Sequence, residues 1–227
     1  MSAIGHYKEF VIRKATEQDI DFLISVICHA EKSGTDKFPL SWLLGKTEAE
    51  LYPVLEYFLK EDIEGLEFAL SGFFVAEYHG VVVAAINTWI EKQNALRLSS
   101  ALIKAHLFKN ILTPAEFQTF QQKATLLTNF VIEREEQALQ FEYGYTLPEF
   151  QGKGIMSALN AAQIAHHHQL YPELRKMQVH IFANNKQSIA TYQKAGLSIV
   201  KQTFSDHPEV VAHFPYHAKV LLEKNIL

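Results

Sequence analysis

Residues 147–159 decide the fold that we expect, and they read Leu147-Pro148-Glu149-Phe150-Gln151-Gly152-Lys153-Gly154-Ile155-Met156-Ser157-Ala158-Leu159. The segment lies between a predicted strand, Ala138–Thr146, and a predicted helix that runs to about Leu170. The first N–H groups of a helix have no partner within it, and glycines let the backbone approach a ligand closely. The pattern therefore indicates a site for a phosphate group, with Lys153 adding positive charge. A tight turn without a ligand is the alternative interpretation.

Two common phosphate loops do not fit this spacing. A P-loop requires Gly-x-x-x-x-Gly-Lys-Ser/Thr, whereas Gly154 follows Lys153 here and no glycine lies five residues before Gly152. The dinucleotide-binding pattern Gly-x-Gly-x-x-Gly fails because Ser157 occupies its third glycine position.

Two motifs give the chain a resemblance to the GNAT superfamily of N-acetyltransferases. Gln151-Gly152-Lys153-Gly154-Ile155-Met156 resembles the family motif Gln/Arg-x-x-Gly-x-Gly/Ala, although Met156 stands where the family favours glycine or alanine. Residues 185–197 resemble Asn-x-x-Ala-x-x-Leu-Tyr-x-Lys-x-Gly-Phe, with matches at Asn185, Tyr192, Lys194 and Gly196 and departures at Ser188, Thr191 and Leu197. The similarity covers residues 9–91 and 138–223, which leaves 92–137 as an insertion.

The resemblance implies a single α/β (α+β) domain over residues 1–227. This GNAT fold has a central mixed sheet of about six to seven strands flanked by helices, with a helical insertion before the cofactor-binding strand. Hydrophobic patterns predict strands at 10–15, 73–78, 81–90, 138–146, 177–182, 197–203 and 218–222. They predict helices from a Thr16 cap to about Glu31, at 51–60, at 155–170 and at 186–195, and two antiparallel helices at 98–111 and 114–135. The start of the second helix stays open, because Thr47 and Glu50 form a capping-box pattern while Pro53 disfavours a helix begun there.

The same resemblance implies that acetyl-CoA binds where strands 138–146 and 177–182 separate. The backbone of Tyr145, Thr146 and Leu147 is then expected to pair with the pantetheine arm, and Asn185 to touch it or to cap the following helix. The remaining residues of this predicted cofactor site are Gln151, Gly152, Lys153, Gly154, Ile155, Met156 and Ser157 around the pyrophosphate, together with Tyr192 and Lys194.

Direct attack of an amine on the thioester needs an acid and a base. By resemblance, Tyr192 protonates the departing thiolate; an aromatic anchor on its helix is the other interpretation. Alternation along 138–146 places Leu139, Phe141, Tyr143 and Tyr145 on one face and Gln140, Glu142, Gly144 and Thr146 on the other. Because a carboxylate within a buried strand needs a partner or a cleft, Glu142 is the predicted base. An ion pair of Glu142 with Arg or Lys from the insertion, Tyr143 as base, and bound water remain alternatives.

Composition narrows the function classes. The 227 residues are 48% hydrophobic and 20% charged, with net charge −4 and no basic stripe, so we expect no nucleic-acid partner. Cys28 is the only cysteine, and apolar runs fall short of the ~18 residues of a membrane helix, which indicates a cytoplasmic protein without a membrane partner. We expect no metal, because His166, His167 and His168 point in divergent directions on a helix whose surface we take as solvated. By the same resemblance, one of His207, His213 and His217 is a candidate contact to the acceptor, and solvated loop histidines are the other interpretation.

The predicted function is therefore transfer of an acetyl group from acetyl-CoA to a small-molecule or peptide amine, with a homodimer possible. A non-catalytic acyl-CoA-binding sensor or interaction module is the main alternative. Transfer of a longer acyl chain, or to a hydroxyl group, is a weaker one.

Overall fold

The central sheet of the computed structural model contains eight strands in the order β1-β2-β3-β4-β5-β6-β8-β7. The structure describes residues 5–7 and 10–226. The strands are β1 Gly5–Tyr7, β2 Phe10–Lys14, β3 Phe73–Tyr78, β4 Val81–Ile90, β5 Leu139–Thr146, β6 Lys176–Phe182, β7 Ser198–Phe204 and β8 Ala218–Asn225. Of these described strands, only β5 and β6 pair in parallel. The mixed α/β fold is confirmed, and β1 is a short edge strand beyond those predicted.

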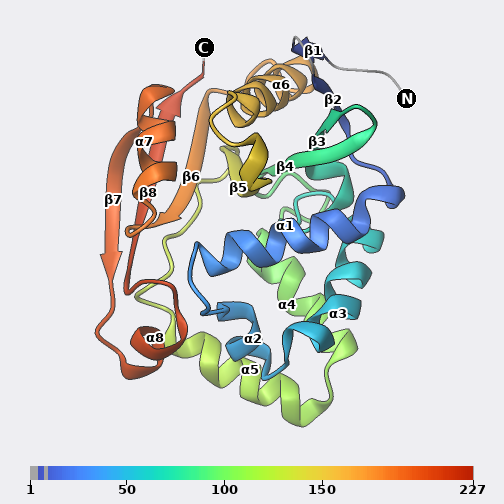
Figure 1. Cartoon of the computed structure of the whole chain (residues 1–227). Coiled ribbons are helices and arrows are strands. Elements are labelled where there is room, and N and C mark those ends of the chain that lie inside the picture. Colours follow the sequence, from blue (N-terminus) through green and yellow to red (C-terminus); the bar gives the residue numbers. More distant parts are fainter. Residues whose placement is uncertain (1–4, 8–9, 227) are drawn as a thin grey trace.

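Helices cover both faces of this sheet, and Figure 1 shows α6 and α1 on opposite sides of β4 and β5. The α-helices are α1 Ile20–Lys32, α2 Pro39–Leu44, α3 Glu48–Glu61, α4 Ser100–Ile111, α5 Pro114–Leu126, α6 Ile155–Leu170, α7 Lys186–Lys194 and α8 Pro208–His213. One core packs α1, α3 and α4 against the sheet, and a second packs α6 and α7 against the opposite face. None of the helices in the described part of the chain has both the length and the apolarity needed to cross a bilayer.

The helix termini settle what the sequence left open. The capping box of Thr47 and Glu50 starts α3, and Pro53 is accommodated inside the helix. Thr113 caps α5 as predicted, but α5 ends at Leu126 and not near 135. The chain leaves the helix because Phe130 packs into a separate apolar cluster with Val210 and Phe214. The short helices α2 and α8 were not predicted.

The predicted alternation along β5 is wrong beyond Phe141. Leu139 and Phe141 pack in the core beneath α6, whereas Tyr143 packs in the core beneath α1. Between the pairs Ala85↔Tyr145 and Asn87↔Glu142, the two residues Tyr143 and Gly144 oppose the single residue Ile86. This bulge, in which Tyr143 has φ 51°, moves the following side chains to the other face. Glu142 and Tyr143 therefore both lie on the α1 side of the sheet.

Candidate active site

A cleft opens where β5 and β6 separate. Their parallel pairing joins Leu139–Phe141 to Met177–Val179 and extends no further. Beyond it the cleft has a volume of about 1140 Å³. It reaches both faces of the sheet, because it is lined by Tyr192 from the core beneath α6 and by Glu31 from the end of α1. Both predicted strands of the cofactor site thus border it.

The N-terminus of α6 forms one wall of this cleft. Gly154 is the N-cap with φ 79°, and Gly152 has φ 75°, a left-handed conformation that favours glycine. A Cβ added to either glycine would meet no described atom within 4 Å, so the loop is open toward the cleft. No side chain of the described residues caps the helix there. The free N–H groups of its first turn and the helix dipole together suit a phosphate group, and the residues present fit a pyrophosphate.

Most predicted cofactor residues line the cleft, but two do not. Those that do are Tyr145, Thr146, Gln151, Gly152, Gly154, Ile155, Met156, Ser157, Asn185, Tyr192 and Lys194. Leu147 lies outside the lining, and its backbone is used within the chain: its N–H donates to the Val83 carbonyl at 2.9 Å, and its carbonyl accepts from the Phe150 N–H at 2.9 Å. Lys153 also lies outside it, with its ammonium 4.8 Å from the Phe150 ring centroid.

Two side chains near the loop have defined places. The side-chain Oδ1 of Asn185 accepts from the Ser188 N–H at 3.1 Å, so Asn185 caps α7, one of its two predicted roles. The Met156 sulfur lies toward Gly144 of β5, where a Cβ would come within 3.4 Å of it. Met156 therefore points its side chain at the sheet and leaves its backbone N–H at the helix start.

Tyr192 reaches the cleft from α7 and is only 8% exposed. Burial raises the pKa of its hydroxyl well above the ordinary value, and the Asn160 side chain beside it offsets part of that rise. Tyr192 is therefore a neutral phenol near pH 7, a state in which it can donate a hydrogen bond.

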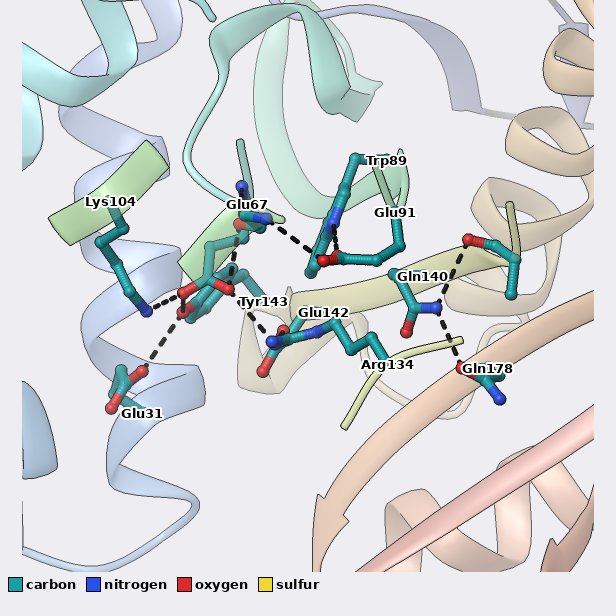
Figure 2. Close-up of polar contacts among 12 residues, drawn as sticks. Glu31, Glu67, Trp89, Glu91, Lys104, Arg134, Gln140, Glu142, Tyr143 and Gln178 are labelled. Atoms are coloured by element: carbon teal, nitrogen blue, oxygen red, sulfur yellow. Dashed lines mark hydrogen bonds and ion pairs between the residues drawn. The ribbon is translucent and has the colours of Figure 1, made fainter. Parts of the chain in front are cut away.

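Glu142 lines the cleft on the α1 side and forms an ion pair with Arg134 (Figure 2). Arg134 belongs to the 92–137 insertion, so the ion pair considered for Glu142 from the sequence is present. No described residue of the insertion lines the cleft itself, so the insertion reaches it through the contact of Arg134 with Glu142. The role of Glu142 as base stays a prediction.

Behind Glu142 lies a buried polar network centred on Glu67, which is 1% exposed. Glu67 pairs with Lys104 of α4 and lies 3.2 Å from Arg134. Burial alone would raise the pKa of the Glu67 carboxyl, but these two cations outweigh it and hold that pKa below its usual range. The Tyr143 hydroxyl lies 3.3 Å from an oxygen of Glu67. Burial and the nearby carboxylates raise the pKa of Tyr143 well above its ordinary value, which disfavours the phenolate that a base would need.

Glu31 is a cleft carboxylate that the sequence analysis missed. It lies at the C-terminal end of α1, where the Tyr143 hydroxyl is 3.3 Å from its Oε1. Among the described residues it forms no ion pair. Burial raises the pKa of the Glu31 carboxyl to about 7, with Glu142 and Glu67 adding to the rise while Lys104 and Lys219 oppose it. A signal was present, because Glu31 follows Ile27 by four residues and so continues the apolar stripe of its helix.

The histidines singled out from the sequence lie away from this chemistry. His167 bonds to the Thr88 hydroxyl at 2.9 Å and His168 to the Ile226 carbonyl at 2.9 Å, so the expectation of a solvated helix surface is wrong for them. His207, His213 and His217 do not line the cleft. In the part of the chain that is described, no three His, Cys, Asp or Glu side chains gather as metal ligands.

Comparisons with known proteins agree with this architecture. The model of the Acetyltransferase (GNAT) family matches residues 39–197. An N-acetyltransferase from Staphylococcus aureus Mu50 superposes with TM-score 0.61 at 15% identity, over 94% of this chain and 99% of that one. A mutant agmatine N-acetyltransferase in its apo form superposes with TM-score 0.59 at 11% sequence identity, over 96% of this chain and 100% of that one. A ribosomal-protein-alanine N-acetyltransferase from Brucella melitensis superposes with TM-score 0.52 at 16% sequence identity, over 95% of this chain and 99% of that one.

At these low sequence identities, the similarity to solved structures supports the fold alone. A search of curated proteins found no match to the chain. The family model spans well over half of the sequence and includes the glycine loop, β6 and all of α7. The chain belongs to the GNAT acetyltransferase family.

Proposed function

We propose that this protein transfers the acetyl group of acetyl-CoA to an amine by direct attack. The observation that carries the proposal is the cleft between β5 and β6, which joins an open helix N-terminus to the carboxylate of Glu31 on the other face of the sheet. The family generally uses acetyl-CoA, and the loop at Gly152 and Gly154 suits its pyrophosphate.

The residues of the cleft divide the work of binding. The N–H groups of Ile155, Met156 and Ser157 bind the pyrophosphate. The backbone of Tyr145 and Thr146, on the edge of β5 that β6 leaves open, hydrogen-bonds the pantetheine arm. The thioester then lies between Tyr192 and the carboxylates of the α1 side.

The reaction needs three proton movements. A carboxylate first takes one proton from the incoming ammonium, the amine nitrogen bonds to the thioester carbonyl carbon, and the carbon–sulfur bond breaks. Tyr192 donates its proton to the departing thiolate, and the second proton of the amine nitrogen, released as the amide forms, restores the Tyr192 hydroxyl. The products are the N-acetylated acceptor and CoA.

Two carboxylates are candidates for that base. Glu142 is the residue predicted from the sequence, but Arg134 engages its Oε2. Glu31 has no cation partner among the described residues, and its pKa of about 7 suits a base that works near neutrality. We therefore assign Glu31 as the base that accepts the proton of the ammonium, and Glu142 as the ion-pair partner of Arg134.

A thiol-release assay with acetyl-CoA and a panel of amines tests the proposal, with calorimetry of CoA binding beside it. Amine-dependent release of CoA, with the acetylated amine identified by mass spectrometry, is expected. CoA binding without turnover across a broad panel would instead support an acyl-CoA sensor. Failure to bind CoA would remove both.

A further inference from the structure

Lys219 places an ammonium on the acceptor side of the cleft. Its neighbours on β8, Ala218 and Val220, pack beneath α6 and α7, so Lys219 projects from the opposite face and lines the cleft. Its Nζ lies 4.7 Å from the Phe182 ring centroid and 5.4 Å from that of Phe130. No ion pair or hydrogen bond of this ammonium is found among the described residues.

This position is unfavourable for a lysine on its own. Burial lowers the pKa of the Lys219 ammonium, and Arg134 and Lys104 lower it further, while Glu142 and Glu31 oppose them. The adjacent His180 adds no second positive charge, because burial together with Arg134 and Lys219 lowers its pKa to about 2 and leaves the ring neutral. A neutral ring cannot balance the charge of the ammonium. Aromatic faces compensate an ammonium only in part. An anionic ligand would supply the missing partner.

The other charges on this side of the cleft are already matched. Glu67 pairs with Lys104 and Arg134, and Glu142 pairs with Arg134 (Figure 2). The two that remain are Glu31 and Lys219. They have opposite sign, line the same cleft and influence each other's charge, yet within the described residues they do not meet as an ion pair. A gap therefore separates the carboxylate from the ammonium.

We propose that Lys219 binds a carboxylate of the acceptor while Glu31 receives its amine, so that the acceptor is a free amino acid or a similar small zwitterion. The inference rests on the proposed function and names its substrate class. A diamine would place its second ammonium near Lys219 and be repelled, and an uncharged amine would leave Lys219 unpaired. Charge-assisted contacts to a carboxylate are among the stronger hydrogen bonds, so discrimination is expected to be substantial.

Matched acceptors test this assignment. Each set contains a free amino acid, its carboxamide and the amine formed by removing the carboxylate, for example leucine, leucinamide and isoamylamine. In the wild-type protein, kcat/KM for the free amino acid is expected to exceed that of both analogues by roughly tenfold to a hundredfold. In Lys219→Met the ratio is expected to fall to near unity.

Lys224→Met is the matched control. Lys224 lies on the same strand but on the opposite face, where its ammonium donates to the Ala195 carbonyl at 2.7 Å. Its acid-to-amide ratio should equal that of the wild type. Lys219→Gln repeats the test with a polar side chain if the methionine variant does not fold.

Equal use of the three acceptors by the wild type, or preference for the amine, would overturn the inference and leave acetyl transfer intact. If no acceptor reacts, titration of the CoA complex with free amino acid still measures the site by calorimetry. Binding that weakens in Lys219→Met but not in Lys224→Met then supports the carboxylate site while the proposed transfer fails. Absence of binding overturns both.

Discussion

Three carboxylates lie close together on the α1 side of the sheet, and their surroundings give them different chemistry. Glu67 is held by two cations and Glu142 by one, whereas Glu31 has none among the described residues. A carboxylate beside a cation stays ionised and binds protons poorly, while an isolated one in a low-dielectric site has its pKa raised. This difference in environment is why we propose Glu31, among the three, for proton transfer.

The pH dependence of catalysis tests this assignment. Only the ionised form of Glu31 can accept a proton, so kcat/KM should rise as pH increases through its pKa of about 7 and then level off. Glu31→Gln should lose this limb and lower kcat/KM by about 10²- to 10⁴-fold. The profiles are measured with one acceptor throughout.

Glu142→Gln is the control for that profile. It should keep the limb and move it to lower pH, because the Glu142 charge is one of the causes that raise the Glu31 pKa. A limb that persists in Glu31→Gln and disappears in Glu142→Gln would assign the base to Glu142.

Tyr192 is tested through turnover and affinity together. Tyr192→Phe removes only the hydroxyl and keeps the ring in its place beneath α6. If the hydroxyl protonates the thiolate, kcat should fall by about 10²-fold, since the lost interaction exists mainly in the transition state. CoA affinity from calorimetry should change little. Unaltered turnover would leave Tyr192 as an aromatic anchor.

Among the elements, the start of α6 is the one on which the proposed binding of CoA depends most. Gly154→Val forces a branched side chain into φ 79° and places it where the diphosphate approaches. CoA binding should be lost in calorimetry. Gly80→Val carries the same strain at φ 82° in the turn between β3 and β4, also in open space, and should retain binding. Normal affinity in Gly154→Val would refute the phosphate-loop assignment.

Local signals predicted the elements better than they predicted the facing of their side chains. The loop at Gly152 and Gly154 could be predicted because a left-handed turn before a helix restricts residue choice. The bulge at Tyr143 could not, because nothing in the local pattern marks a tyrosine with positive φ. Because of the bulge, Tyr143 lies on the α1 side together with Glu142. The predicted alternation, which placed these two residues on opposite faces, was therefore a poor guide to which side chains share one side of the cleft.

The cleft charges themselves were only partly predictable. Glu142 stood out as a carboxylate in a buried strand, but its partner Arg134 comes from a segment without regular structure that was predicted to be helical. The pairing of Glu67 with Lys104 depends on tertiary packing between distant segments. Lys219 alternates with apolar residues on β8, a pattern from which its facing could have been inferred.

For the molecule as a whole, the buried charge network attaches the insertion to the sheet. Arg134→Met leaves the carboxylates of Glu67 and Glu142 short of a cation, and breaking a buried pair in this way costs about 3–5 kcal/mol of the free energy of unfolding. The midpoint of urea unfolding should fall accordingly. Arg97→Met, which removes an exposed pair with Glu136 in the same insertion, should cost less than about 1 kcal/mol. Equal losses would contradict a structural role for the network.

The short pairing of β5 with β6 has a mechanical consequence. Within the described chain, three residue pairs are the only backbone ladder between β1–β5 on one side and β6, β8 and β7 on the other, so the sheet is two plates joined along a short hinge. A pantetheine chain lying in the opening would hydrogen-bond to the strand edges where β5 and β6 no longer pair with each other. Binding of acetyl-CoA would then hold the two parts of the sheet together, and the rigidity of the protein would increase with the fraction of molecules that carry the cofactor.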